Sequence, residues 1–138
     1  MTTLTFPGRF ESLPAIADFV RQAAQDAGLS SFQVYAVETA LDEACANIIE
    51  HAYGGENKGE IECSCLIDDV GLTVILRDQG HPFNPKKIKN PDVKAPLQER
   101  SDHGLGLYFI RQWMDEVDFD FKPGHNTLTM SKRKEKER

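Results

Sequence analysis

The segment Asp42-Glu43-Ala44-Cys45-Ala46-Asn47-Ile48-Ile49-Glu50-His51 decides how this chain of 138 residues is interpreted. It belongs to a predicted helix that Ser30 or Ser31 caps and that runs to about Tyr53. Plotted at about 100° per residue, one side of this helix is an apolar core stripe. On the other side we expect small residues that let something approach the backbone, followed by polar residues that carry chemistry. This row consists of Ala36, Ala40, Glu43, Asn47 and His51.

Glu43 and Asn47 lie one helical turn apart, so their side chains are neighbours. A carboxylate can take a proton from a hydroxyl or a water. An amide oxygen is a hard ligand for Mg²⁺, which uses few protein ligands beside phosphates and waters. The pair fits a general base beside a metal-bound phosphate, whereas Asp42 points elsewhere and is the weaker candidate. On this helix alone, a solvated polar face with a local Glu-Asn contact is the simpler interpretation.

A second candidate site begins at Asp78, where the apolar strand pattern from Leu72 ends. An aspartate at the end of a buried strand can accept a hydrogen bond from an exocyclic amine such as adenine N6. Gly80 would let a ring lie against the backbone. The alternative is a plain strand-terminating turn, because Asp and Gly are common turn residues.

The third candidate is the glycine-rich segment His103-Gly104-Leu105-Gly106-Leu107, which opens an amphipathic helix. Free N–H groups at a helix start favour anions, and Gly104 and Gly106 would let the chain pass close to phosphates. No strand immediately precedes the segment, its third glycine is missing, and the Gly-Lys-Ser/Thr element is absent. The Rossmann fingerprint and the Walker A loop are therefore both excluded. A glycine-rich hinge is the alternative.

Residues 79–102 show no periodicity and contain four prolines. A loop of this length in a compact domain is usually functional, and we interpret it as a lid. Its basic side chains could screen a triphosphate or meet an acidic partner, while a solvated loop explains any one of them equally well. They are Lys86, Lys87, Lys89, Lys94 and Arg100.

The order of strand and helix patterns predicts an α+β fold with two layers, in which three helices cover one face of a mixed sheet. One domain is expected over residues 1–131, with the lid at about 79–102, and residues 132–138 read as a solvated charged tail. Strands are expected near 3–6, 59–67, 72–77, 117–121 and 127–130, and helices near 12–27, 31–53 and 104–113.

The composition is that of an ordinary globular domain, with 40% hydrophobic and 28% charged residues. A net charge of −6 argues against nucleic acid as a partner, because nucleic-acid binders usually carry a basic face. No apolar run approaches the roughly 20 residues that span a bilayer, and we expect neither a signal peptide nor a membrane partner. Three cysteines, an odd number, indicate reduced thiols in a cytoplasmic protein.

The order and spacing of the three candidate segments resemble the N, G1 and G2 boxes of the Bergerat-fold ATPases. Here these boxes read Glu43-x-x-x-Asn47, Asp78-x-Gly80 and Gly104-x-Gly106. The residues within and around these boxes are most similar to those of the bacterial anti-sigma-factor serine/threonine kinases. The segments that carry this similarity are Glu43–Asn47 with His51-Ala52-Tyr53, Asp78–Phe83, and Gly104–Ile110 with Met114–Val117. The resemblance covers nearly the whole chain, from the first strand to Met130.

By this resemblance, Glu43 is the general base and Asn47 is the Mg²⁺ ligand. Asp78 binds the adenine amine, Gly80 flanks the ring, and Thr127 lies near the adenine. Family members often place a lid arginine near the terminal phosphate, and Arg100 is the only arginine in this lid. The other residues that the resemblance assigns to ATP binding are His51, Gly104, Leu105, Gly106 and Leu107.

The resemblance implies an ATP- and Mg²⁺-dependent serine/threonine protein kinase. It would phosphorylate a STAS-domain anti-anti-sigma partner and sequester a sigma factor in a partner-switching circuit, and a homodimer is expected from the resemblance alone. Two alternatives stay open, an ATP-binding module that sequesters a partner without phosphotransfer and a detached histidine-kinase-like ATPase domain. The retained Glu43 favours the kinase, because a pure binder does not need a base.

Overall fold

The computed structural model describes residues 1–82 and 102–135. Residues 102–106 are described by their backbone alone. Most of the expected lid, including Arg100, therefore lies outside the described residues. The elements, in chain order, are β1 (Thr2–Pro7), η1 (Phe10–Ser12), α1 (Leu13–Asp26), α2 (Ser31–Asn47), η2 (Ile48–Ala52), β2 (Glu60–Ile67), β3 (Gly71–Asp78), α3 (Asp102–Trp113), β4 (Glu116–Lys122) and β5 (His125–Arg133).

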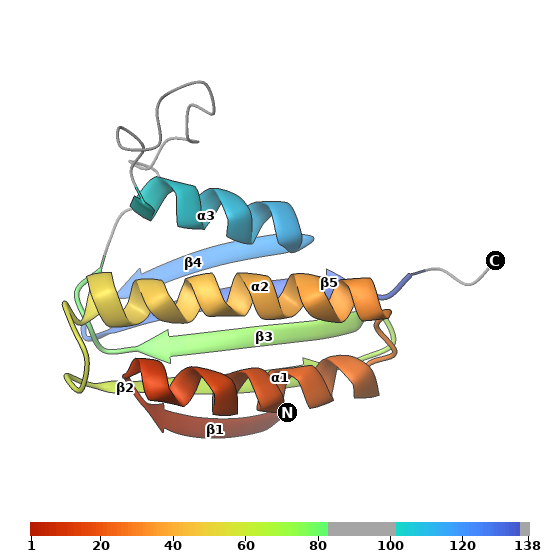
Figure 1. Cartoon of the computed structure of the whole chain (residues 1–138), viewed down its shortest axis with the longest axis horizontal. Coiled ribbons are helices and arrows are strands. Elements are labelled where there is room, and N and C mark those ends of the chain that lie inside the picture. Colours follow the sequence, from red (N-terminus) through yellow and green to blue (C-terminus); the bar gives the residue numbers. More distant parts are fainter. Residues whose placement is uncertain (83–101, 136–138) are drawn as a thin grey trace.

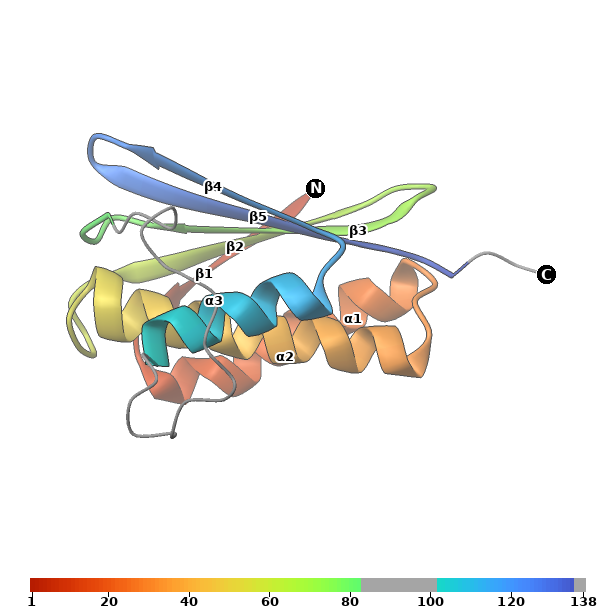
Figure 2. The same ribbon diagram turned by 90° about the horizontal axis from the view of Figure 1, so that it is seen from above.

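The five strands form one sheet in the order β1-β2-β3-β5-β4. Figures 1 and 2 show α1, α2 and α3 on the same face of this sheet, which confirms the predicted two-layer α+β architecture. Every neighbouring pair of described strands is antiparallel. The prediction of a mixed sheet is therefore wrong.

The connections between strands explain why the sheet is antiparallel. A single crossover helix returns the chain to its starting end and produces a parallel neighbour. Between β1 and β2 the chain passes through two helices, so β2 starts where β1 finished and runs the opposite way. The single helix α3 does give β4 the direction of β3, but β5 lies between them and pairs antiparallel with both.

Helix α2 is the central helix of its layer and starts with a capping box. The hydroxyl of Ser30 accepts a hydrogen bond of 3.2 Å from the N–H of Gln33, whose side-chain oxygen accepts one of 3.1 Å from the N–H of Ser30. α2 packs against α1 on one side and α3 on the other (Figure 1). Ala36 and Ala40 are 0% exposed. The elements that these small residues allow to approach the backbone are therefore parts of the protein itself.

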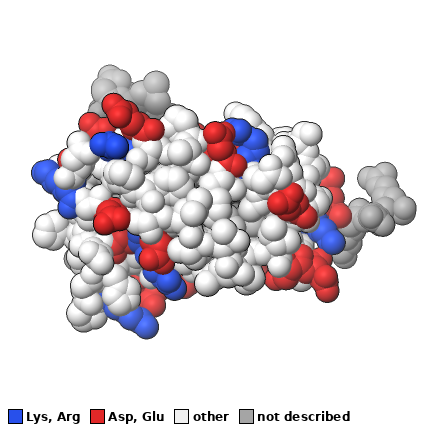
Figure 3. Space-filling view, turned by 90° about the horizontal axis from the view of Figure 1, so that it is seen from below, with Lys and Arg blue, Asp and Glu red and all other residues white. Residues whose placement is uncertain are grey.

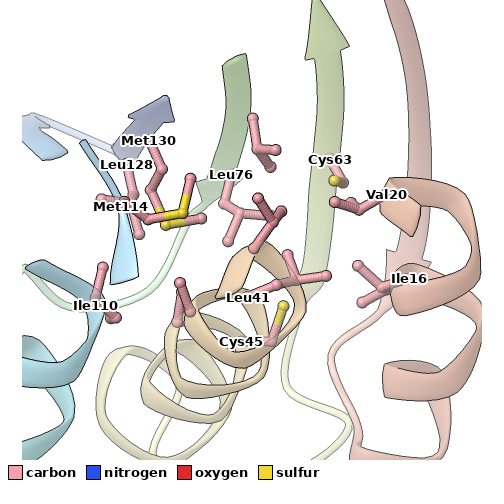
Figure 4. Close-up of a cluster of buried hydrophobic side chains, with 14 of the residues drawn as sticks. Ile16, Val20, Leu41, Cys45, Cys63, Leu76, Ile110, Met114, Leu128 and Met130 are labelled. Atoms are coloured by element: carbon pink, nitrogen blue, oxygen red, sulfur yellow. The ribbon is translucent and has the colours of Figure 1, made fainter. Parts of the chain in front are cut away.

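The hydrophobic core fills the space between the helical layer and the inner face of the sheet. Figure 4 shows side chains of α1, α2 and α3 meeting alternate residues of β2, β3 and β5. Cys45, Cys63 and Cys65 are part of this core, and all three are free and buried. Burial raises the pKa of the Cys45 thiol to about 12, so this side chain packs as a small apolar group.

Strand β5 extends further than the sequence analysis expected, because Lys132 and Arg133 continue it beyond residue 131. The carbonyl of Arg133 accepts a hydrogen bond of 2.6 Å from the side chain of Gln33, and its N–H donates one of 2.6 Å to Asp115. These contacts tie the strand end to the start of α2 and to the segment after α3. Residues 136–138 lie outside the described part of the chain.

The surface view in Figure 3 shows acidic and basic side chains interspersed on one side of the molecule, around a broad uncharged area. The charge on that side is therefore distributed and not gathered in a patch of one sign. Across residues 1–82 and 102–135, no helix has the length and apolar character needed to cross a membrane.

Candidate nucleotide site

A cavity that is partly open to solvent lies between the end of α2 and the inner face of the sheet. Its wall brings together three residues that the sequence analysis placed in a nucleotide site, namely Asn47, Asp78 and Thr127. It also includes Asn126, which the sequence analysis did not single out. The complete lining is Ala44, Asn47, Ile48, Asp78, Ile110, Phe119, Phe121, Asn126, Thr127 and Leu128.

The wall contributed by β4 is aromatic. The rings of Phe119 and Phe121 lie 6.0 Å apart between centroids and are inclined by only 15°. Both residues are half-buried and line the cavity, together with the apolar side chains of Ile48 and Ile110. An apolar cavity with a few convergent polar groups is the usual form of a small-molecule site, and flat rings suit a flat ligand.

Asp78 is the last residue of β3 and is 7% exposed. Its Oδ1 accepts hydrogen bonds from the N–H of Gly80, at 2.9 Å, and from the amide of Asn126, at 2.8 Å. Burial raises the pKa of this carboxyl, and the two hydrogen bonds offset the rise only in part. Both bonds recorded among the described residues end on Oδ1, so Oδ2 is available to a ligand.

Asn126 lies opposite Asp78 in the pairing of β3 with β5 and is 5% exposed. Its amide also donates a hydrogen bond of 3.1 Å to the carbonyl of Gly80, so one side chain holds both positions of the Asp78-x-Gly80 motif. A signal for this residue was present in the sequence. Asn126 alternates along the strand with Leu128 and Met130, so all three side chains point to the inner face of the sheet. An amide on that face needs a buried hydrogen-bond partner.

Asn47 is the last residue of α2 and is 8% exposed. Its side chain makes no hydrogen bond within the described residues. Its polar atoms are not fully buried either, because no fully buried side-chain nitrogen or oxygen among the described residues lacks a partner. The amide therefore reaches the cavity, where a ligand could bind it. Immediately after Asn47 the helix widens into the π-helical turn η2, a form that is frequent at functional sites.

Glu43 and His51 lie one turn before and one turn after Asn47, outside the cavity wall. Glu43 is half-buried and is not among the residues that line the cavity. His51 lies on the outer side of η2, where its Nε2 is 3.9 Å from a carboxylate oxygen of Glu50. Their roles as general base and as ATP-binding residue stay predictions.

Gly80 is needed for a reason that the sequence did not show. A Cβ on this residue would overlap the carbonyl group of Ala52, because the chain after β3 packs directly on η2. The N–H of His81 confirms how close the two segments are, since it donates a hydrogen bond of 2.7 Å to the same Ala52 carbonyl. Contact between Gly80 and an adenine ring stays a prediction.

Thr127 occupies a less direct position than expected. It alternates with Asn126 and Leu128, which are buried on the inner face, and its cross-strand partners are the exposed residues Arg77 and Asp120. Thr127 is half-buried and lies at the edge of the cavity, at a position of β5 that belongs to the outer face of the sheet. Among the neighbouring β5 residues, Asn126 is the one that contacts Asp78.

The glycine-rich segment forms the first turn of α3, which begins at Asp102 and includes Gly104 and Gly106. The side chain of Leu107 is 2% exposed and belongs to the hydrophobic core. Any contact of Leu107 with phosphate would therefore use its backbone N–H. The side chains of Leu105 and Arg100 are outside the described residues.

The antiparallel sheet therefore carries, on its helical side, a cavity framed by an amide on the central helix and a carboxylate at a strand end. The sequence model of the family described as "Histidine kinase-like ATPase domain" matches residues 6–132. The chain belongs to this family.

Comparison with curated proteins places the chain beside a narrower group of relatives within this family. A serine-protein kinase RsbW of Bacillus velezensis is 36% identical over 100 residues, which cover 70% of this chain and 62% of the relative. An RsbW of Bacillus mycoides is 28% identical over 129 residues, which cover 91% of this chain and 80% of that relative. These relatives confirm the similarity to anti-sigma-factor serine/threonine kinases that the motifs predicted.

Proposed function

We propose that this protein is an ATP- and Mg²⁺-dependent serine/threonine protein kinase of the anti-sigma-factor type. The observation that carries the proposal is the cavity in which Asn47 of α2 and Asp78 of β3 come together, one turn from Glu43. The similarity to proteins named serine-protein kinase supports a hydroxyl group as the phosphate acceptor.

The adenine end of the cavity is defined by Asp78. Its ionised carboxylate is an acceptor for the exocyclic amine of adenine, while Phe119 and Phe121 offer a flat apolar wall. Guanine presents a carbonyl oxygen where adenine has its amine, and two facing acceptors would leave a buried polar group unpaired. The site therefore favours ATP over GTP.

The phosphate end is defined by Asn47, whose amide has no protein partner among the described residues. Its oxygen suits Mg²⁺, and the ion when bound would neutralise charge on the phosphates. In the described part of the chain, no group of three or more His, Cys, Asp or Glu side chains gathers to hold a metal. Mg²⁺ would therefore share its coordination between Asn47, phosphate oxygens and water.

Glu43 is the proposed base for transfer. The hydroxyl oxygen of a serine or threonine attacks the γ-phosphorus, its proton passes to the Glu43 carboxylate, and the bond from the phosphorus to the ADP oxygen breaks. Positioning and charge neutralisation supply most of the rate enhancement in such reactions. An ATP-binding module without turnover would need Asn47 and Asp78 but not Glu43.

We further propose a STAS-domain anti-anti-sigma protein as the substrate, a sigma factor as the sequestered partner and a homodimer acting in the cytoplasm. The test combines purified protein, Mg²⁺ and γ-labelled ATP with such a STAS protein. The expected product is one phosphoserine or phosphothreonine on the STAS protein. Nucleotide binding without transfer would favour the binding module, and label on histidine would favour a detached histidine-kinase-like domain.

A further inference from the structure

Tyr53 directly follows η2, and its side chain bridges the start of β2 and the end of β3. Its hydroxyl donates a hydrogen bond of 2.6 Å to the carbonyl of Glu60 and accepts one of 3.0 Å from the N–H of Gln79. Burial raises the pKa of this hydroxyl, so it stays protonated at neutral pH and keeps its donor hydrogen. One side chain thus holds the residue that immediately follows Asp78.

The ring of Tyr53 is held as firmly as its hydroxyl. It packs on the backbone of Gly59, where a Cβ would overlap the ring, and a Cβ on Gly8 would lie 3.5 Å from it. The N–H of Gly8 in turn donates a hydrogen bond of 2.8 Å to the carbonyl of Gly59. The ring therefore rests against two backbone segments that are themselves joined.

Two backbone contacts also join η2 to the residues that follow β3. The carbonyl of Ala52 accepts a hydrogen bond from the N–H of His81, and Gly80 packs against that carbonyl without room for a Cβ. Together with the Tyr53 hydroxyl, these contacts fasten η2 to the end of β3. Asn47 is the residue just before η2, and Asp78 is the last residue of β3. These contacts therefore connect the helical segment next to Asn47 with the strand end at Asp78.

We propose that Tyr53 is a positioning residue that sets Asp78 relative to Asn47 and thereby sharpens recognition of the adenine amine. The inference rests on the proposed nucleotide function. Binding groups must be held to within about 0.5 Å of their productive geometry. Asn126 supports Asp78 from β5, but the pairing of β3 with β2 ends at Arg77, and the Tyr53 hydroxyl supplies the support on that side. Without the Tyr53 hydroxyl, the Gln79 N–H would bond to water, and the Asp78 carboxylate would sample positions away from the amine.

The test measures binding of Mg²⁺·ADP by calorimetry, next to the diphosphate of purine riboside, which lacks the 6-amino group. Tyr53→Phe should bind ADP about three- to tenfold more weakly and the analogue almost unchanged, so discrimination between the two falls. Tyr35→Phe is the matched control, because Tyr35 is a 58% exposed tyrosine on α2, remote from this joint. Gly59→Ala, which displaces the ring but keeps the hydroxyl, should reproduce the loss of discrimination.

The outcomes separate this inference from the proposed function. Faster amide exchange at Gln79 and His81 in Tyr53→Phe, with reduced discrimination, supports the positioning role. Equal discrimination in wild type and Tyr53→Phe would overturn it, as would a uniform loss of affinity for both nucleotides. If wild-type protein binds neither nucleotide, the proposed function itself fails.

Discussion

Asn126 on β5 donates a hydrogen bond of 2.8 Å to the carboxylate of Asp78 on the neighbouring strand β3. The two residues pair directly across the strands, and both are more than nine-tenths buried. A second bond from the same amide to the carbonyl of Gly80 fixes the turn that follows. The carboxylate that we assign to adenine is therefore oriented from β5, by a residue 48 positions further along the chain.

Replacing Asn126 with alanine should impair both the fold and the site. Asn126→Ala leaves the buried oxygen of Asp78 without one donor, which costs about 1 to 3 kcal/mol in the free energy of unfolding. We expect a lower urea midpoint and weaker ADP binding in calorimetry. Thr129→Ala, at a half-buried position of the same strand, controls for loss of strand propensity. Unchanged ADP affinity in Asn126→Ala would show that Asp78 needs no orientation.

Replacing Asp78 with asparagine tests the effect of its buried charge on stability. A carboxyl whose pKa is raised in the folded state binds its proton more tightly there than in the unfolded chain. Its contribution to stability therefore falls as pH rises from its ordinary value of 3.8 through the folded pKa. Asp78→Asn should be at least as stable as wild type at pH 7 in urea unfolding. A marked loss of stability would mean that the ionised form is favourable overall.

The same carboxyl should make adenine binding depend on pH. Protonation removes acceptor capacity from Asp78, so ADP affinity should fall as pH is lowered through its raised pKa. Calorimetric titrations over a pH series measure this fall. In Asp78→Asn the fall should be absent and affinity should be low throughout. An identical pH profile in the variant would assign the titration to another group or to the phosphates.

Replacing Glu43 with glutamine should separate binding from transfer. Glu43→Gln keeps the size of the side chain but removes the base, so phosphotransfer should drop by about 10² to 10⁴ while ADP affinity stays the same. Asp42→Asn is the matched control, because Asp42 is the exposed neighbour on the same helix. Equal phosphotransfer by Glu43→Gln and wild type would remove Glu43 from the role of base.

Replacing Asn47 with alanine should affect metal-dependent binding alone. The amide has no hydrogen-bond partner among the described residues, so its loss should leave thermal stability close to wild type. Binding of Mg²⁺·ADP should weaken about tenfold or more, equivalent to about 1.4 kcal/mol. Binding of ADP in excess EDTA should be the same in both proteins. A variant that keeps its Mg²⁺ dependence would contradict the metal assignment.

The sequence by itself determined the local parts of this protein. Capping by Ser30, the helical period through Asn47 and the turn residues after Asp78 are short-range features, and the structure has the expected helices and five strands at these places. The order and spacing of the three motifs also carried the resemblance to the family whose sequence model matches residues 6–132. These features could be predicted because capping, helical period and turn composition depend on residues that lie close together in the sequence.

Only the tertiary structure decided which surfaces face each other. Ala36 and Ala40 look open on a helical wheel, yet α2 lies between two helices and buries them. The sheet is antiparallel because the chain crosses through two helices before β2, and β5 lies between β3 and β4. Asn126 reaches Asp78 for the same reason, since long-range strand pairing, and not local periodicity, selects the partner of each buried polar group.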